Sequence, residues 1–583
     1  MNAHKNLYPL LIFLLALAVQ LSALFYIFDP LVYFFKYWEL ALRLQGVITP
    51  QIEVFYSSPF YIVFLAAGQW TGRNILDLQI LQAFLGAFNC WLIYRLGRLC
   101  FNCQVGYIAA LAAVFYGPFV IYGTSFLPAI WVVTFNLAAL ICLVPAGSGG
   151  KASWIAGAGL FIGLSIISRP NAVIFLLLVI PYLVVNSGAP ISLMPGVSRR
   201  RNVGGVSNPD PAGQIVGGVS NPDSAKRIVG GVSNPDSARL RIGVGNPSHS
   251  GWEIGLIKPS HRVVAGQPIG GKWGTRIRRI FLLLIPVALV VLPVTLFNYA
   301  NSGEFIPVTA SGGWVFYSGN NPRAMGFDFS PPPELEERTI AYYARPGDGK
   351  LSYLEHLFSL EIARERTGRD LKHGEGSAFW FQEGLLFIRQ HPGRYLRLLG
   401  KKLLALANGY EPHDVPEVME RANHARIFPF IAPAILMPIA LLGVIIARPR
   451  AAGPILYLYL ASYLISSLLI YVIPRFRLAV APVLLIFAAA AVRQLCRRAR
   501  ERRWAVLGRD LLLLLALAIL VNIKTPDMRR DREVNRPAFL QEWKGLTAMK
   551  QGRWTEAGDA FRKALELNPG SRRARRGLES VKK

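Results

Sequence analysis

The sequence predicts an all-α, polytopic membrane protein that carries an α-rich loop domain and a C-terminal helical pair outside the membrane. Three observations predict this fold class. Of the 583 residues, 53% are hydrophobic and only 17% are charged, whereas about a quarter are charged in soluble proteins. The apolar residues form uninterrupted stretches near the ~20 residues that cross a bilayer. Basic residues flank these stretches, as they do in membrane proteins.

About eleven apolar stretches are predicted to be transmembrane helices. They cover residues 7–28, 75–94, 105–122, 126–144, 152–167, 172–185, 280–297, 427–446, 455–473, 478–492 and 504–523. The first stretch is too long for the core of a signal peptide and lacks a small-residue cleavage site at its end. We therefore expect it to be retained as the first helix.

The basic loops predict the orientation of these helices. If the N-terminus is cytoplasmic, the loops carrying Arg95, Lys151, Arg448 and the 493–503 arginine cluster all lie inside, as the positive-inside rule requires. The net charge of +29 is then a topology signal of a cell inner (plasma) membrane protein, and nucleic-acid binding is not expected.

This orientation divides the chain into six parts. They are an N-terminal transmembrane module with its first outer loop (1–187, loop 29–74), a cytoplasmic insert (188–276), one transmembrane helix (277–299), an extracytoplasmic loop (300–426), C-terminal transmembrane helices (427–523) and a C-terminal segment (524–583). The large loop and the C-terminal segment are both predicted to be extracytoplasmic.

Two parts carry internal patterns. The insert repeats Val-Gly-Gly-Val-Ser-Asn-Pro-Asp at residues 203–210, 216–223 and 229–236, which is typical of a low-complexity loop, although a repeat-based binding site stays open. The C-terminal segment has the spacing of one tetratricopeptide repeat. Its marker residues are Gly545, Gly552, Ala557, Phe561, Ala564 and Pro569. A single repeat cannot bury a continuous core, so it either packs on the outer loop or joins a protein partner.

Asp29 is the first candidate for chemistry. It directly follows the first membrane helix, where desolvation would raise the pKa of its carboxyl group and suit it to act as a general base. An interfacial helix cap before Pro30 is the equally weighted alternative. No metal is predicted, because Cys100-x-x-Cys103 is a lone pair and the outer-loop histidines lack ligand spacing.

Several short motifs occur in a fixed order along the chain. They are Asp29-x-x-x-Tyr33, Ser58-Pro-Phe-Tyr61, Leu81-Gln-Ala-Phe-Leu-Gly86, Ser168-Arg-Pro-Asn171, Asn408-Gly-Tyr-Glu411 and Arg475-Phe-Arg-Leu478. In this order they resemble the bacterial relatives of the dolichyl-phosphate-mannose protein mannosyltransferases and lipid A aminoarabinose transferases, which have the GT-C fold. The C-terminal repeat is similar to that of members carrying tetratricopeptide repeats.

The resemblance implies an inverting glycosyltransferase that moves a sugar from a polyprenyl-phosphate carrier to a hydroxyl acceptor at the extracytoplasmic face, without a cofactor. Asp29 matches the family's general base, and Tyr33 with Glu53 would shape the pocket. Arg475 and Arg477 would hold the leaving phosphate, because the guanidinium fork suits phosphate oxygens. Their alternative role is to anchor the helix to lipid headgroups.

Arg169 is a weaker phosphate candidate, whose alternative role is to end a helix before Pro170. One departure from the family concerns Ser125, which stands where relatives commonly carry a second acid. A hydroxyl cannot replace a carboxylate as a base at neutral pH. The alternative function is therefore a non-catalytic scaffold for envelope or polysaccharide assembly that uses the outer loop and the repeat. A transporter is disfavoured, because the chain lacks paired charges within Gly/Pro-broken membrane segments.

Overall fold

The structure is a computed structural model, and a few segments lie outside the part that it describes. The described residues are 4–27, 36–47, 51–147, 151–185, 273–344, 355–412, 414–425, 428, 430–449 and 453–582. In these ranges the ordered elements are helices, apart from one isolated β-bridge between Tyr116 and Ile431. The predicted all-α fold class is therefore confirmed. The repeats of the insert and the residues Asp29 and Tyr33 lie outside the described residues.

Apolar helices occupy every predicted membrane stretch in the described chain. Six are long: α1 with η1 (Leu7–Ile27), α4 (Ile75–Cys100), α7 (Ala129–Gly147), α10 (Trp273–Ser302), α19 (Pro474–Arg500) and α20 (Trp504–Asn522). Five are shorter: α5 (Cys103–Val114), α8 (Ala152–Ser168), η2 with α9 (Pro170–Val185), α17 (Pro433–Ile446) and α18 (Gly453–Leu469). The chain is a multi-pass membrane protein.

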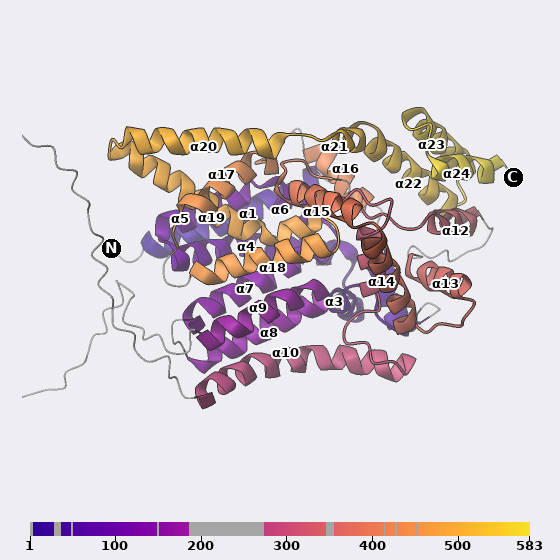
Figure 1. The fold of residues 1–583 in the computed structure, drawn as a ribbon, viewed down its shortest axis with the longest axis horizontal. Helices are drawn as coiled ribbons and strands as arrows, with labels where there is room; N and C mark the ends of the chain where they lie inside the picture. Colours follow the sequence, from indigo (N-terminus) through magenta and orange to yellow (C-terminus); the bar gives the residue numbers. More distant parts are fainter. Residues whose placement is uncertain are drawn as a thin grey trace, which may run out of the picture. The chain divides into compact units, whose positions relative to one another are not determined.

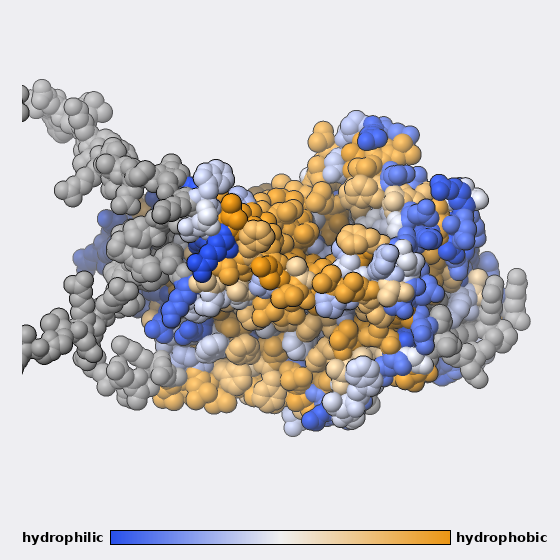
Figure 2. Space-filling view, turned by 90° about the horizontal axis from the view of Figure 1, so that it is seen from below, coloured by the Kyte–Doolittle hydropathy of each residue, from blue (hydrophilic) through white to orange (hydrophobic). Residues whose placement is uncertain are grey.

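The apolar helices pack into a bundle in which α7, α8 and α10 run side by side (Figure 1). Figure 2 shows hydrophobic residues covering the middle of the bundle, with hydrophilic residues toward both of its ends, one of which carries α12 and α13. The outward faces of α10 and α20 expose large apolar side chains such as Leu289 and Leu512. Apolar surface of this kind is typical of helices that face lipid, as predicted for these stretches.

One predicted stretch is interrupted. Residues 105–122 were expected to form one span, but α5 ends at Val114 and a separate short helix, α6 (Gly117–Thr124), follows it. Pro118 has no backbone N–H and disfavours helical geometry in the residue before it, so the helix breaks here. At this interruption the backbone forms a hydrogen bond with a distant segment: the Ile431 N–H donates to the Phe115 carbonyl at 2.7 Å.

Close helix contact in the bundle depends on glycine. Gly443 of α17 lies so near α19 that a Cβ there would collide with the Phe487 carbonyl, whereas Gly508 of α20 has no heavy atom within 4 Å of that position. Small residues allow such close approach between membrane helices. We expect Gly443→Ala to destabilise the detergent-solubilised protein by about 1–3 kcal/mol. Thermal unfolding should show Gly508→Ala to be neutral, and equal effects of the two variants would contradict this packing.

The described residues of the 300–426 loop form an α-helical domain. Its helices are α11 (Gly312–Gly319), α12 (Pro333–Ala344), α13 (Glu355–Thr367), α14 (His373–Gln390), α15 (Pro392–Ala407) and α16 (Pro416–Ala425). Trp314 and Trp380 are almost fully buried and meet edge to face with ring centroids 4.9 Å apart. This aromatic core gives the loop a fixed shape over the membrane helices.

The first outer loop contributes two helices, α2 (Lys36–Leu44) and α3 (Pro59–Trp70). The short helix α2 buries Tyr37, Leu40 and Ala41 against the main core and is strongly amphipathic, as expected for an interfacial helix. Glu39 and Arg43 form an ion pair one turn apart at 3.4 Å.

The C-terminal segment continues through α21 (Pro526–Arg530) and η4 (Asp531–Asn535) into α22 (Arg536–Lys550), α23 (Trp554–Leu567) and α24 (Arg572–Lys582). Phe561 and Ala564 of the repeat share a hydrophobic cluster with Ile340 of α12. Arg576 and Glu337 add an ion pair at 2.7 Å. Of the two predicted arrangements, the structure therefore shows the repeat packed on the outer loop of its own chain.

Candidate functional site

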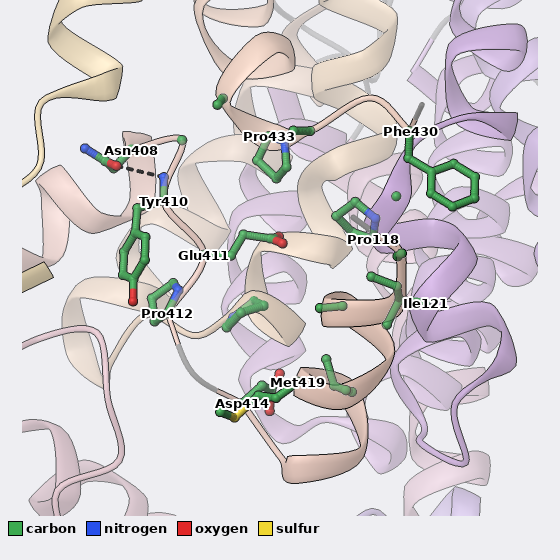
Figure 3. Close-up of a pocket in the computed structure, with 18 of the residues that line it drawn as sticks. Pro118, Ile121, Asn408, Tyr410, Glu411, Pro412, Asp414, Met419, Phe430 and Pro433 are labelled. Carbon is green, nitrogen blue, oxygen red and sulfur yellow. Dashed lines mark hydrogen bonds between the residues drawn. The ribbon is translucent and has the colours of Figure 1, made fainter. Parts of the chain in front are cut away.

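A cavity of about 450 Å³ opens where α6, α16 and the start of α17 meet the 408–414 loop and the C-terminal segment. One side of the cavity is apolar and includes Pro118, Ile121 and Phe430. The other side carries Glu411 and Asp414, and Figure 3 shows the Glu411 side chain extending into the space toward the apolar side. The cavity is therefore amphipathic.

The 408–414 loop is held in place by backbone and side-chain hydrogen bonds. The Gly409 N–H donates to the Val521 carbonyl at 2.9 Å, and the Asn408 amide donates to the Ile523 carbonyl at 2.7 Å. The Tyr410 N–H donates to the Asn408 side chain at 2.8 Å. These bonds fix the loop against the end of α20, so the carboxylates that follow have defined positions.

Arg477 also holds the 408–414 loop in place. Its two terminal nitrogens donate to the carbonyl oxygens of Tyr410 and Asn408, at 2.7 and 2.6 Å. Sequence reasoning made Arg477 a phosphate ligand, but its described hydrogen bonds are to backbone. The structure gives it a positioning role in this loop, and phosphate binding through Arg477 stays a prediction.

Arg475 is paired with a buried carboxylate. Its Nε lies 2.7 Å from Oδ1 of Asp414, whose side chain is 1% exposed while that of Arg475 is 25% exposed. The Tyr122 hydroxyl donates a short hydrogen bond to the other carboxylate oxygen. This pair connects α19 with α6 and with the cavity wall.

Arg169 and Tyr37 complete this polar cluster. Arg169 donates to the Arg475 carbonyl at 3.1 Å and stacks over the Phe476 ring, 4.6 Å from its centroid. Tyr37 of α2 is buried beside both arginines. Burial raises the pKa of the Tyr37 hydroxyl, and the positive charges of Arg475 and Arg169 act in the opposite direction. Two predicted phosphate ligands and the first outer loop thus meet at one place.

Two arginines beside one carboxylate leave the cluster with an excess of positive charge. Burial lowers the pKa of the Arg169 guanidinium, and the like charge of Arg475 lowers it further, so the two guanidinium groups repel each other. An anion between them would relieve that repulsion. We define Tyr37, Tyr122, Arg169, Asp414 and Arg475 as the arginine cluster.

Glu53 lies in a different set of contacts. Its carboxylate is 3.1 Å from Nε2 of His373, and its side chain is 67% exposed. The other ring nitrogen of His373 is 2.7 Å from the Tyr56 hydroxyl, and Tyr56 stacks on His356. No described contact brings Glu53 to the arginine cluster, so its role in a substrate pocket stays a prediction.

Asp29 and Tyr33 lie outside the described residues, but the elements on either side of them are described. The preceding element, η1 (Ala23–Ile27), contacts both α6 and α16, which line the cavity. The following element is α2, which carries Tyr37 of the arginine cluster. The described elements on either side of Asp29 and Tyr33 therefore contact the helices of the cavity wall and contribute to the cluster.

Sequence reasoning missed the carboxylates of residues 411–417. Glu417 of α16 accepts a hydrogen bond from the Phe126 N–H at 3.2 Å and pairs with Arg421 at 3.3 Å. Glu417 therefore places a carboxylate next to Ser125, which stands where relatives commonly carry a second acid. The Ser125 hydroxyl itself donates to the Ile121 carbonyl at 2.7 Å. The signal in the sequence that could have indicated these carboxylates was the close spacing of Glu411, Asp414 and Glu417. The sequence analysis used this region only for the motif Asn408-Gly-Tyr-Glu411.

Burial raises the pKa of both Glu411 and Glu417, and the nearby guanidinium groups of Arg477 and Arg421, respectively, work against that rise. A carboxyl group with a raised pKa can exchange protons nearer to neutral pH. In the described part of the chain, no group of three or more His, Cys, Asp or Glu side chains is arranged to hold a metal ion.

The fold and the cluster together define a class: a multi-pass α-helical membrane protein with an arginine-rich polar site between its helices and an α-helical loop domain. Residues 59–195 match the family described as dolichyl-phosphate-mannose-protein mannosyltransferase, so this segment of the chain is similar to that family. Residues 538–571 match the tetratricopeptide repeat. Both resemblances predicted from the sequence are confirmed.

The comparison with solved structures found oligosaccharyltransferases from Archaeoglobus fulgidus. The apo oligosaccharyltransferase aligns with a TM-score of 0.40 and 13% identity over 98% of this chain and 61% of its own. The form tethered to an acceptor peptide with an NVT sequon aligns with a TM-score of 0.41 and 12% identity, over 100% and 64% of the two chains. The chain thus spans about three fifths of these relatives. None of the curated proteins matches it.

Proposed function

We propose that this protein is an inverting membrane glycosyltransferase that transfers a sugar from a polyprenyl-phosphate carrier to a hydroxyl acceptor on the extracytoplasmic side. The observation that carries the proposal is the meeting of Arg169, Arg475 and the first outer loop in one polar cluster beside an amphipathic cavity. The family of residues 59–195 indicates the reaction class.

The reaction needs a base, an anion site and an apolar groove. In the proposal, Asp29 takes the proton of the acceptor hydroxyl while that oxygen attacks the anomeric carbon. The bond between the anomeric carbon and the phosphate oxygen breaks, and its electron pair leaves with the polyprenyl phosphate. A single displacement of this kind inverts the anomeric centre.

The arginine cluster supplies the electrostatic stabilisation. Arg475 is oriented by Asp414 through one nitrogen, Nε, and its side chain is 25% exposed. Arg169 is fixed by its bond to the Arg475 backbone. Preorganised guanidinium groups stabilise charge that develops on a leaving phosphate without having to reorient. Ile121 and Phe430 on the apolar side of the cavity would contact the isoprenoid chain. Tyr33 and Glu53 would border the sugar.

The test of the function is transfer by purified protein in liposomes. Sugars linked to polyprenyl phosphate should serve as donors, and the corresponding nucleotide sugars should not. Transfer from nucleotide sugars alone would contradict the proposal. The absence of transfer from every lipid-linked donor, with protein partners captured through the outer loop and the repeat, would support the scaffold alternative.

The orientation can be tested with the native cysteines. Cys103 and Cys496 are exposed, while Cys90, Cys100 and Cys142 are buried. The proposed topology places both exposed thiols on the cytoplasmic side. A membrane-impermeant maleimide should therefore label neither in intact cells and both after permeabilisation, as read by mass spectrometry. Labelling of either thiol in intact cells would contradict the proposed topology.

A further inference from the structure

The C-terminal segment supplies one wall of the cavity. Asn522 at the end of α20, Lys524, Arg532 of η4 and Arg536 at the start of α22 all line it. These residues lie far outside the family-matching segment, which ends at residue 195. The cavity is thus completed by the segment that leads into the tetratricopeptide repeat.

This wall is fixed in place by polar contacts. The buried carboxylate of Asp531 accepts a hydrogen bond from the Tyr410 hydroxyl at 2.7 Å. Asp527 pairs with Lys401 of α15 at 2.6 Å. Further along, Lys544 of α22 pairs with Glu420 of α16 at 3.2 Å. The segment is therefore bound to the same loop and the same helix that form the opposite sides of the cavity.

Positive charge predominates around the cavity. Three cationic side chains line it, against the two carboxylates of Glu411 and Asp414. Asp414 is already paired with Arg475. None of the ion pairs between described residues includes Lys524, Arg532 or Arg536, and the charge of Arg536 acts on Glu411, whose pKa it lowers against the effect of burial. A partly enclosed site of one predominant sign attracts ligands of the opposite sign.

We propose that Lys524, Arg532 and Arg536 form an anion site for the phosphate group of an amphiphilic ligand whose apolar chain lies along Ile121 and Phe430. This inference deepens the proposed function, on which its choice of a polyprenyl phosphate rests. It gives the C-terminal segment a role in ligand binding within its own chain. A membrane phospholipid offers the same chemistry, a phosphate joined to an apolar chain.

The experiment measures binding to the full-length purified protein by microscale thermophoresis, with inorganic phosphate and farnesyl phosphate as probes. We expect Lys524→Gln/Arg536→Gln to weaken farnesyl phosphate binding about 10-fold or more, because charge-assisted hydrogen bonds are lost. The matched control, Arg529→Gln/Arg530→Gln, removes two exposed charges from the same segment that do not line the cavity. It should bind like the wild type.

Further arms separate the possible outcomes. Lys524→Arg/Arg536→Lys should retain binding and so guards against a folding defect in the glutamine variant. Competition by phosphatidylglycerol nanodiscs, but not by phosphatidylcholine nanodiscs, would support the site and assign it to an anionic membrane lipid. Equal binding by the glutamine variant and its control would overturn the proposal, as would a wild type that binds neither probe. Asp29→Asn should bind normally, so failure of the catalytic proposal and failure of this one can be distinguished.

Discussion

Replacing Asp29 with asparagine is expected to lower the transfer rate by about 10²–10⁴-fold, the usual contribution of a positioned general base. The amide cannot accept the proton of the acceptor hydroxyl, although it has nearly the same size. Donor binding should be unchanged, because the phosphate is proposed to be held by cationic side chains and Asp29 is not one of them. The measurement is single-turnover transfer from a lipid-linked sugar at saturating donor, together with the donor Kd.

Two variants serve as controls for this prediction. Asp77→Asn alters a half-buried carboxylate in the first turn of α4, where the new amide oxygen can still accept from the Asn74 N–H. It should transfer at the wild-type rate. Glu411→Gln tests a carboxylate that the structure places in the cavity. If Asp29→Asn keeps full activity while Glu411→Gln loses it, the base is Glu411 and the assignment of Asp29 is wrong.

Replacing Asp414 with alanine is expected to destabilise the protein by about 3 kcal/mol and to abolish transfer. Removing one partner of a buried ion pair costs about 3–5 kcal/mol, because the other charge is left uncompensated. We expect a cost at the lower end of this range, because the Arg475 side chain is 25% exposed and water can partly solvate its charge. The Tyr122 hydroxyl also loses its acceptor. Chemical unfolding followed by tryptophan fluorescence gives the stability, and the transfer assay gives the activity.

The matched control is Asp527→Ala, which breaks an ion pair of similar length between side chains that are 39% and 47% exposed. Exposed pairs contribute only about 0–1 kcal/mol, so this variant should remain close to wild type. The double variant Asp414→Asn/Arg475→Gln should recover part of the lost stability, because no unpaired charge remains, but it should not recover transfer. If Asp414→Ala loses no more stability than Asp527→Ala, the pair of Asp414 and Arg475 is not a buried structural element.

The extent to which the site could be predicted differs from residue to residue. Arg169 and Arg475 were both identified from short motifs, and the structure places them in contact. Their common anchor, Asp414, was not identified, because the hydrogen bond that joins it to Tyr122 spans 292 positions of the sequence. Arg477 stands only two residues from Arg475, yet its guanidinium points to backbone carbonyls. Helical spacing sends these two side chains in different directions.

The sequence alone determined the membrane helices and the repeat. The length of an apolar stretch and the spacing of small residues are local properties of the sequence. The thickness of the bilayer relates the first to a membrane-spanning helix, and close helix packing relates the second to the repeat. Tertiary structure decided where polar groups find their partners: it broke one predicted span at Pro118, brought Glu417 beside Ser125, and made the C-terminal segment a wall of the cavity. Such pairings depend on how distant helices pack, because a buried charge is stable only where a partner from another element reaches it.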